Sequence, residues 1–400
     1  MSAAAGPSSF APASEEELAG AVAEAARSGQ PLAVEGNGTK RAMLRPVQAA
    51  RTLSTRNLSG ITLYKPQELI LSARAGTPLP EIEAALAERG QHLIAEPPEP
   101  GPLFGADRPA TLGGVVAANL SGPRRITAGA TRDHVMGIRA VTGSGEVFRS
   151  GGRVLKNVTG LDLAKLLTGS HGTLGVLTEI TLKVLPAPER TATVALRVAD
   201  LAAGVRALSA GLGSPYGVSG AALLPEDGAG GGPLALLRVE DFAESVAYRA
   251  GRLRDELAPL GEAGLLEDAE SRALWHRVRD AEPLGAEPGD AVWRVSVRPS
   301  AGPAVAGAVR AAGLRRRLLD WGGGLVWIAG PATAEAHEAV AAAARAEGGA
   351  FTLFRAPDSL RAAVAVLPEE PEPLAAIGRR VKAVLDPAGV LNPGRMRAGS

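Results

Sequence analysis

Apolar and polar positions over the first ninety residues predict helices and strands in turn. Apolar residues recur at helical intervals after Ser14, which begins a capping box, and this helix ends at Gly29, a residue that accepts the left-handed conformation. The apolar run 31–34 follows directly and predicts a short strand. A second strand is predicted over 68–73 and a second helix over 80–90. The chain therefore begins as a mixed α and β domain.

The middle of the chain continues this alternation. A short helix of small residues is predicted over 115–120, and a β-hairpin over 135–148, where two β-rich runs flank a Gly-Ser-Gly turn. A further helix over 161–167 precedes a strand over 172–185. A pair of prolines follows this strand and predicts a domain boundary.

The second half of the chain has a different texture, because it holds all four tryptophans and two long helices rich in Ala, Arg and Glu. The helices are predicted over 243–257 and 334–347, and the strands over 191–198, 291–297, 324–328 and 362–366. Two helices over a small sheet in β-α-β order indicate a ferredoxin-like unit. No internal repeat is evident.

Length and composition limit the classes of function. A chain of 400 residues exceeds what one hydrophobic core usually supports, so two domains are expected. The absence of cysteine excludes disulfides, zinc fingers, cysteine-ligated iron–sulfur clusters and thiol catalysis. The net charge of +1 argues against a nucleic-acid-binding surface. Because no apolar run reaches the length of about 18 residues that a membrane span needs, and residues 1–12 lack a secretory signal, we expect a cytoplasmic protein.

One glycine-rich turn follows a predicted strand and is a candidate anion site. In the run Gly36, Asn37, Gly38, Thr39 and Lys40, several consecutive main-chain amides can face a phosphate. The run lacks the Gly-Lys-Ser/Thr of a P-loop and the six-residue glycine fingerprint of a Rossmann fold, which disfavours a nicotinamide-linked enzyme. Taken alone, the run fits an ordinary Gly/Asn turn better than an anion site.

Two further glycine-bearing segments are candidates of the same kind. Gly113 and Gly114 begin a helix, where free amides and the positive helix end favour phosphate. Gly175 and Val176 end a third glycine-bearing turn, which begins at Gly172. Close helix packing and a plain bend before a strand explain these two segments as well.

The order and the sequences of these segments resemble those of one protein family. The resemblance is carried by the segments Thr111–Arg125, Arg132–Gly137, Lys156–Leu163, Gly169–Ile180 and Asp386–Met396. Together they are similar to the FAD-linked oxidases of the vanillyl-alcohol oxidase or PCMH type, and more narrowly to the FAD-binding subunits of bacterial glycolate oxidase. The resemblance covers roughly residues 30–186 and about the last fifteen residues, and it is much less distinct over 190–370.

The resemblance implies an α+β fold with a fixed order of parts. A PCMH-type FAD-binding domain of two α/β subdomains would occupy residues 13–187, after a disordered N-terminus at 1–12. A smaller, ferredoxin-like α+β domain at 188–385 would serve as a substrate cap or a subunit-interaction domain. The segment 386–400 would return to the FAD-binding domain.

The resemblance also implies a set of residues that bind FAD. Gly36 to Lys40 would wrap the pyrophosphate through main-chain amides. Thr111, Gly113, Gly114, Ser121 and Gly122 would line the cofactor between its phosphates and the flavin, Gly175 and Val176 would contact the adenosine and ribitol region, and Lys156 and Asn392 would lie nearer the isoalloxazine. Since the first glycine turn has no histidine and the chain has no cysteine, noncovalent FAD is expected.

Catalytic residues are not assigned by the sequence. Oxidation of a 2-hydroxy acid requires a base for the hydroxyl proton and a cation for the carboxylate. The catalytic relatives carry a His-x-Gly-Asp-Gly-Asn-x-His cluster that this sequence lacks. The five histidines, which are His92, His134, His171, His276 and His337, have no metal-ligand spacing and fit surface or packing roles better than proton transfer. Arg124 and Arg125 could hold a carboxylate or the FAD phosphates, and a solvated or ion-paired role is at least as compatible.

The leading hypothesis is an FAD-binding subunit of a glycolate oxidase-type complex, which oxidises glycolate or a similar small 2-hydroxy acid. Electrons would pass to partners, namely a second flavin subunit and an iron–sulfur subunit, since this chain has no cysteine to ligate a cluster. Attachment to a membrane would be peripheral and through these partners. The alternatives are a self-sufficient flavin oxidoreductase acting on another alcohol or hydroxy acid, and a scaffold subunit whose flavin never cycles.

Overall fold

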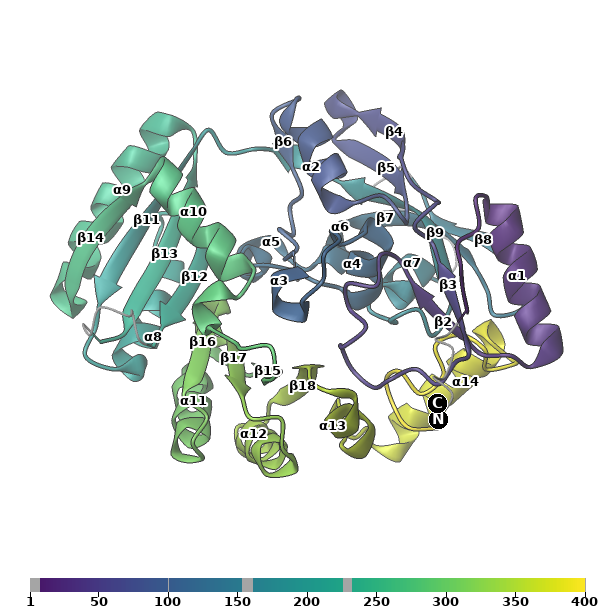
Figure 1. Ribbon diagram of the computed structural model, residues 1–400. Helices are drawn as coiled ribbons and strands as arrows, with labels where there is room; N and C mark the ends of the chain where they lie inside the picture. The colour runs from purple at the N-terminus through teal and green to yellow at the C-terminus, as the bar shows by residue number, and fades with distance from the viewer. Residues whose placement is uncertain (1–7, 100, 153–160, 226–231, 400) are drawn as a thin grey trace.

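The computed structural model describes residues 8–99, 101–152, 161–225 and 232–399, and Lys156 lies outside these ranges. Figure 1 shows two bodies side by side, one formed by the purple and blue N-terminal elements and the other by a large teal and green sheet. The N-terminal body contains β1 (Ser8–Phe10), α1 (Glu15–Ser28), β2 (Leu32–Glu35), β3 (Arg51–Ser54), β4 (Ile61–Lys65), β5 (Ile70–Arg74), α2 (Leu79–Ala87), β6 (Gln91–His92), α3 (Gly101–Phe104), α4 (Leu112–Ala118), α5 (Arg125–Ala128), α6 (Thr131–His134), β7 (Val135–Val141), β8 (Val147–Gly151), α7 (Leu163–Leu167), β9 (Val176–Lys183) and β10 (Leu185–Pro186).

The first elements form a small parallel sheet covered by α1. The strand order is β1-β3-β2. The Ser14 hydroxyl accepts a hydrogen bond from the Glu17 amide at 3.1 Å, and Gly29 ends the helix with a φ of 64°, which confirms the predicted capping at both ends. Leu18 and Val22 of α1 are fully buried in the small core beneath the sheet.

The larger sheet of the N-terminal body has five antiparallel strands in the order β4-β5-β9-β7-β8, and β6 and β10 form a separate pair. The predicted hairpin is confirmed, since β7 and β8 pair antiparallel from Gly137 with Gly151 to Val141 with Val147. Helix α4 packs against this sheet very closely. A Cβ atom at Gly113 would lie 2.7 Å from the Cβ atom of Ala75, so only glycine permits this approach.

The second body is one eight-stranded sheet built from two ferredoxin-like units. Its elements are β11 (Arg190–Arg197), α8 (Leu201–Leu212), β12 (Val218–Leu224), β13 (Leu234–Asp241), α9 (Ala243–Leu257), β14 (Glu262–Glu267), α10 (Asp268–Arg279), β15 (Ala291–Ser296), α11 (Gly302–Ala311), β16 (Arg316–Asp320), β17 (Leu325–Gly330), α12 (Ala334–Ala346) and β18 (Ala350–Arg355). The strand order is β14-β11-β13-β12-β16-β17-β15-β18. Each half follows the β-α-β-β-α-β pattern, and the two halves join where Leu223 of β12 pairs with Leu319 of β16.

This arrangement differs from the sequence-based expectation in two respects. One ferredoxin-like unit and no repeat were expected, whereas two units are present, because the pairing of strands depends on which faces are apolar and not on repeated residues. The strand predicted at 362–366 is wrong, since residues 358–363 form helix α13 (Asp358–Ala363) and the edge strand is β18. Helix α13 follows Pro357, which favours a helix start at the next residues.

The C-terminal segment returns to the N-terminal body after α13 and α14 (Glu372–Leu385). Figure 1 shows the yellow C-terminal helix α14 at the N-terminal body, and the segment after it reaches strand β2. The Leu32 amide donates to the Val390 carbonyl at 2.8 Å, and the Asn392 amide donates to the Leu32 carbonyl at 3.0 Å. Within the ranges that the structure describes, none of the helices has the length and apolar character needed to cross a bilayer.

Candidate functional site

A cavity of about 590 Å³ lies where the β2–β3 loop, helix α4 and the C-terminal segment meet. Its lining includes eight of the residues expected to bind FAD, namely Gly36, Asn37, Gly38, Thr39, Lys40, Thr111, Gly114 and Asn392. These residues come from three distant parts of the sequence, so the fold alone brings them together. We call this feature the β2-loop cavity.

The turn from Gly36 to Lys40 presents main-chain amides without acceptors. Within the described residues, no hydrogen bond engages the N–H group of any of these five residues. A Cβ atom at Gly36 would lie 2.1 Å from Thr111 Oγ1, and Gly38 has a φ of 76°, so both positions require glycine. Consecutive free amides in such a turn form a cradle for an anion.

Helix α4 contributes to the cavity in another way than expected. Its first amides are already engaged, because the Gly113 amide donates to the Ala75 carbonyl at 2.7 Å and the Gly114 amide donates to Thr111 Oγ1 at 3.4 Å. The free amides predicted at this helix start are therefore absent. Gly114 instead leaves room for the Lys40 side chain, whose Nζ atom would lie 3.2 Å from a Cβ atom at this position.

Lys40 brings an unpaired positive charge to the cavity. Its Nζ atom donates to Thr39 Oγ1 at 3.0 Å, and no carboxylate of the described chain lies within ion-pair distance. Burial lowers the pKa of Lys40 to about 8, although the Glu99 carboxylate acts against this shift. An anionic ligand beside Lys40 would stabilise the charged ammonium and so raise this pKa again.

Arg395 brings a second positive charge, which has no carboxylate partner in the described part of the chain. Its guanidinium donates to the main-chain carbonyls of Lys40 at 2.6 Å, Arg41 at 3.2 Å and Arg45 at 3.3 Å. Burial, together with the positive charge of Arg361, lowers the pKa of Arg395 to about 10. Arg395 therefore holds the loop after Lys40 in place while it adds charge to the cavity.

The other charged residues of the lining are paired with one another. Arg41 forms an ion pair with Glu35 at 2.5 Å, and Arg361 pairs with Asp358. Among the described lining residues, this leaves the charges of Lys40 and Arg395 without an opposite partner. A ligand with about two negative charges matches this excess.

His171 lines the cavity and was expected to be a packing or surface histidine. Burial and the positive charges of Arg395 and Lys40 lower the pKa of His171 to about 3, so the imidazole is neutral at physiological pH. His171 has a φ of 53°, which keeps its main chain in the turn before β9. Its place within the resembling segment Gly169–Ile180 is the one signal in the sequence that pointed to it.

Asn392 ties two walls of the cavity together. Its Oδ1 atom accepts from the Val34 amide at 2.7 Å, and its Nδ2 atom donates to the His171 carbonyl at 2.9 Å. The amide side chain thus joins β2 to the turn before β9. The sequence placed Asn392 in a cofactor motif but gave no sign of this bridging geometry.

Several residues that the sequence assigned to FAD do not line the β2-loop cavity. These are Gly113, which packs on Ala75; Ser121, which accepts from the Thr131 amide at 2.9 Å; Gly122, which packs on the Glu96 carbonyl; Gly175, which packs on Leu167; and Val176, which is buried in the small core. Close packing of the chain at these positions therefore explains why small or apolar residues occupy them. Lys156 falls outside the described residues.

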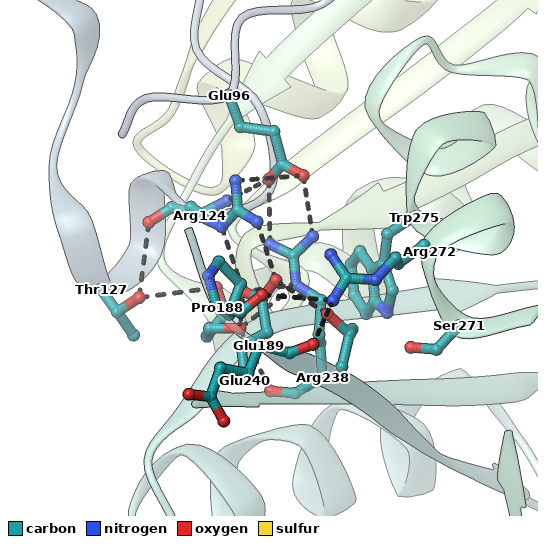
Figure 2. A network of polar contacts seen from close by, with 12 residues as sticks. Glu96, Arg124, Thr127, Pro188, Glu189, Arg238, Glu240, Ser271, Arg272 and Trp275 are labelled. Carbon is teal, nitrogen blue, oxygen red and sulfur yellow. Dashed lines mark hydrogen bonds and ion pairs between the residues drawn. The ribbon is translucent and has the colours of Figure 1, made fainter. Parts of the chain in front are cut away.

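A second polar centre lies between the two bodies and differs in its charge balance. Figure 2 shows Glu96 on one side and Glu240 on the other, with the guanidiniums of Arg124 and Arg238 between them. Arg238 donates to both Glu96 oxygens at 2.8 and 2.9 Å, and Arg124 donates to both Glu240 oxygens at 3.0 and 2.7 Å. We call these four residues the interdomain charge cluster.

The charges of this cluster compensate one another. Burial opposes ionisation of Glu96 and Glu240, but Arg238 and Arg124 hold the pKa values of both carboxyls below their usual range. Ser219 Oγ adds a hydrogen bond of 2.6 Å to Glu240. The cluster joins Glu96 and Arg124 of the N-terminal body to strand β13, and it leaves no charge free for a ligand. In the described parts of the chain, no group of three His, Cys, Asp or Glu side chains is placed to hold a metal ion.

Comparison with known proteins relates the chain to flavin enzymes. Residues 8–151 match the model of a family described as FAD binding domain. The glycolate oxidase subunit GlcE of Escherichia coli strain K12 is 38% identical over 92% of this chain and 93% of its own length. The glycolate oxidase subunit GlcD of Bacillus subtilis strain 168 is 28% identical over 46% of this chain and 38% of its own length.

A solved structure shows the same fold. p-Cresol methylhydroxylase superposes with a TM-score of 0.71 over 97% of this chain and 88% of its own, at 13% sequence identity. The expectation of an α+β fold with a PCMH-type FAD-binding part is therefore confirmed.

Proposed function

We propose a function that starts from an established point: this chain belongs to the family of FAD-linked oxidoreductases that contains glycolate oxidase subunit GlcE. FAD is its cofactor, and the chain is an oxidoreductase. The proposal is that it serves as the FAD-binding subunit of a complex that oxidises glycolate or a similar small 2-hydroxy acid. The electrons pass from this subunit to a partner.

The observation that carries the proposal is the character of the β2-loop cavity. Five consecutive main-chain amides without acceptors and two unpaired cations face a space of about 590 Å³. This set suits the pyrophosphate of FAD, which carries two negative charges and several acceptor oxygens.

The residues that would hold FAD follow from this geometry. Gly36 to Lys40 would donate main-chain hydrogen bonds to the pyrophosphate, and Lys40 and Arg395 would balance its charge. Asn392 keeps the walls of the cavity at a fixed distance. FAD, when bound, supplies the capacity to accept a hydride from a carbon that bears a hydroxyl group.

The proposal includes noncovalent attachment of FAD. The chain contains no cysteine, and His171 is the histidine that lines the cavity. Trichloroacetic acid precipitation of the flavin-loaded chain should release the flavin into the supernatant. A yellow pellet would contradict noncovalent attachment.

Partner subunits complete the proposed complex. The chain has no cysteine with which to ligate an iron–sulfur cluster, so we propose that a separate iron–sulfur subunit carries electrons onward. Because GlcE and GlcD are both named as glycolate oxidase subunits, we propose a GlcD-like second flavin subunit as the other partner. Such a complex would work in the cytoplasm, with any membrane attachment made through the partners.

Anaerobic mixing of the FAD-loaded chain with glycolate or D-lactate tests the proposal. Loss of flavin absorbance at a rate that matches turnover would assign substrate oxidation to this chain itself, whereas reduction only after addition of the partner flavin subunit supports a relay. A flavin that stays oxidised during turnover of the assembled complex, or a chain that binds no FAD, would contradict the proposal.

A self-sufficient oxidoreductase is the second candidate function, and one observation favours it. Such an enzyme needs a cation of its own to hold the substrate carboxylate. Arg294 of β15 is a guanidinium with no ion pair or hydrogen bond in the described chain.

A further inference from the structure

Arg294 projects from β15 toward the N-terminal body and is enclosed by aromatic rings. Its Cζ atom lies 4.8 Å from the centroid of Trp327, 5.4 Å from that of Trp321 and 5.5 Å from that of Phe354. The neighbouring residue on the strand, Trp293, points the other way and donates to His337 of α12 at 3.2 Å. Arg294 is therefore on the face of the sheet that is turned toward the N-terminal body.

The guanidinium of Arg294 has no polar partner within the described residues. Its Nε atom is buried and makes no hydrogen bond, and the side chain as a whole is only partly buried. A buried donor without an acceptor costs free energy, and proteins rarely leave one without a ligand or water to satisfy it. Within the described residues, the other nitrogens of the guanidinium make no hydrogen bond or ion pair either, so they too are available to a ligand.

A second guanidinium reaches the same place from the N-terminal body. The Arg125 Cζ atom lies 4.7 Å from the centroid of the Trp321 ring. Arg125 belongs to the short helix α5, is partly buried, and has no ion pair in the described chain. Two unpaired positive charges, one from each body, thus rest against one tryptophan.

Trp321 connects this place to a segment that the sequence assigned to the cofactor. Its Nε1 atom donates to the Gly122 carbonyl at 3.1 Å. Its φ of 53° is unusual for a bulky residue and is held by the amide, which donates to Asp320 Oδ1 at 2.7 Å. The ring is therefore fixed from both bodies before any ligand arrives.

The contrast with Arg238 shows that stacking on tryptophan does not explain an unpaired arginine. The Arg238 Cζ atom lies 4.6 Å from the Trp275 centroid, a contact of the same kind on the same sheet. Arg238 nevertheless forms a bidentate ion pair with Glu96 at 2.8 and 2.9 Å. At Arg294 the carboxylate is missing.

We propose that Arg294 and Arg125, placed around Trp321, bind the carboxylate of a small 2-hydroxy acid. This inference rests on the proposed function and adds that this chain, and not only a partner, holds the substrate. A guanidinium recognises a carboxylate by two parallel hydrogen bonds, and the apolar rings around it exclude water that would weaken them.

The electrostatics of the place are consistent with this assignment. Burial, together with the charge of Arg125, lowers the pKa of Arg294 to about 10, and a bound carboxylate would reverse that shift. The nearest acid, Asp320, does not supply the missing charge, because burial raises its pKa to about 7 and it lies beyond ion-pair distance of Arg294.

The test measures carboxylate binding to the FAD-loaded chain through its tryptophan fluorescence. Glycolate, D-lactate and oxalate are titrated at pH 7, with glycolamide as the uncharged match of glycolate. We expect saturable quenching by the acids and none by glycolamide. Arg294→Gln and Arg125→Gln should each weaken binding at least tenfold. Arg298→Gln removes an arginine that pairs with Glu347 two residues after the same strand, and it should leave affinity unchanged.

The outcomes separate this inference from the proposed function. Binding within twofold of wild type in both arginine variants, or equal binding of glycolamide, would overturn the carboxylate site. If Arg294→Gln fails to fold, as judged by its flavin content and thermal midpoint, Arg125→Gln decides. Carboxylate binding that depends on the arginines without any flavin reduction, alone or in the complex, would leave the site intact and refute the oxidation. Flavin reduction at the wild-type rate in both variants would refute the carboxylate site and leave the proposed oxidation intact.

Discussion

The β2-loop cavity and the interdomain charge cluster are both rich in buried charge, but they treat it in opposite ways. In the cluster, each of the four charged side chains lies within hydrogen-bond distance of an opposite charge. In the cavity, Lys40 and Arg395 have no carboxylate partner among the described residues, and five amides lack acceptors. Paired charges compensate one another within the fold, so that removing one partner is costly, whereas unpaired charges and donors mark a place where a ligand completes the structure.

Removing one acid from the cluster is expected to give the largest effect. Glu96→Ala leaves Arg238 buried without its bidentate partner, so the free energy of unfolding should fall by about 3–5 kcal/mol. Urea unfolding followed by tryptophan fluorescence measures this change. As a control, Glu347→Ala breaks an exposed pair with Arg298 and should cost no more than about 1 kcal/mol. Equal losses in the two variants would remove the distinction between cluster and surface.

Removing a cation from the cavity should weaken FAD binding strongly, but, unlike the loss of Glu96, it should not lower the stability of the FAD-free chain. Lys40→Met should weaken FAD binding by about 10- to 100-fold, which corresponds to about 1.4–2.7 kcal/mol. The FAD-free chain should be as stable as wild type or more stable, because a buried unpaired ammonium is removed. Flavin fluorescence titration measures the affinity. Lys65→Met, at an exposed pair with Glu68, is the matched control. An FAD-free chain that Lys40→Met destabilises by several kcal/mol would show that Lys40 is structural.

The pH dependence of FAD binding should report the unpaired lysine. The pKa of Lys40 is lowered to about 8 in the free cavity, and the pyrophosphate would raise it, so binding takes up a proton above pH 8. FAD affinity should therefore be constant below pH 8 and fall by at most about tenfold per pH unit above it. The same slope in Lys40→Met would assign the proton to another group.

The smallest effect is expected at His171. Its pKa of about 3 keeps the imidazole neutral across the working range, so His171→Gln should not change the pH profile of FAD binding between pH 5 and 8. A profile that loses a step near pH 6 in this variant would show that the imidazole titrates.

The local features of the N-terminal body could be predicted from sequence, because short-range rules govern them. The capping of α1 by Ser14 and Gly29 depends on residues within one or two turns. The turn from Gly36 to Lys40 was recognisable because glycines at fixed places after a strand signal a special backbone. In both cases the neighbours in the chain are also the neighbours in space.

The features that join distant segments could not be predicted. Arg395 binds the carbonyl of Lys40, and Arg294 meets Trp321, through contacts that depend on the final arrangement of sheets. Arginine is so common in this chain that neither Arg294 nor Arg395 stood out, whereas Arg124 and Arg125 did because they follow a glycine-bearing helix. The doubled ferredoxin-like sheet was missed for the same reason, since the sequence of a single strand does not determine which strands lie beside it.

The position of Asn392 has a consequence for the order of events in a cell. Its side chain closes the cavity by bonding to Val34, a residue 358 positions earlier in the chain. Arg395, which holds the Lys40 loop, comes later still. During synthesis the Gly36–Lys40 turn is therefore made early, and it lacks the contacts of Asn392 and Arg395 until the residues of both bodies have been synthesised. With FAD in this cavity, as proposed, we expect flavin loading to follow the synthesis of residues 392–395, and a polypeptide interrupted before residue 392 should bind FAD more weakly than the full chain.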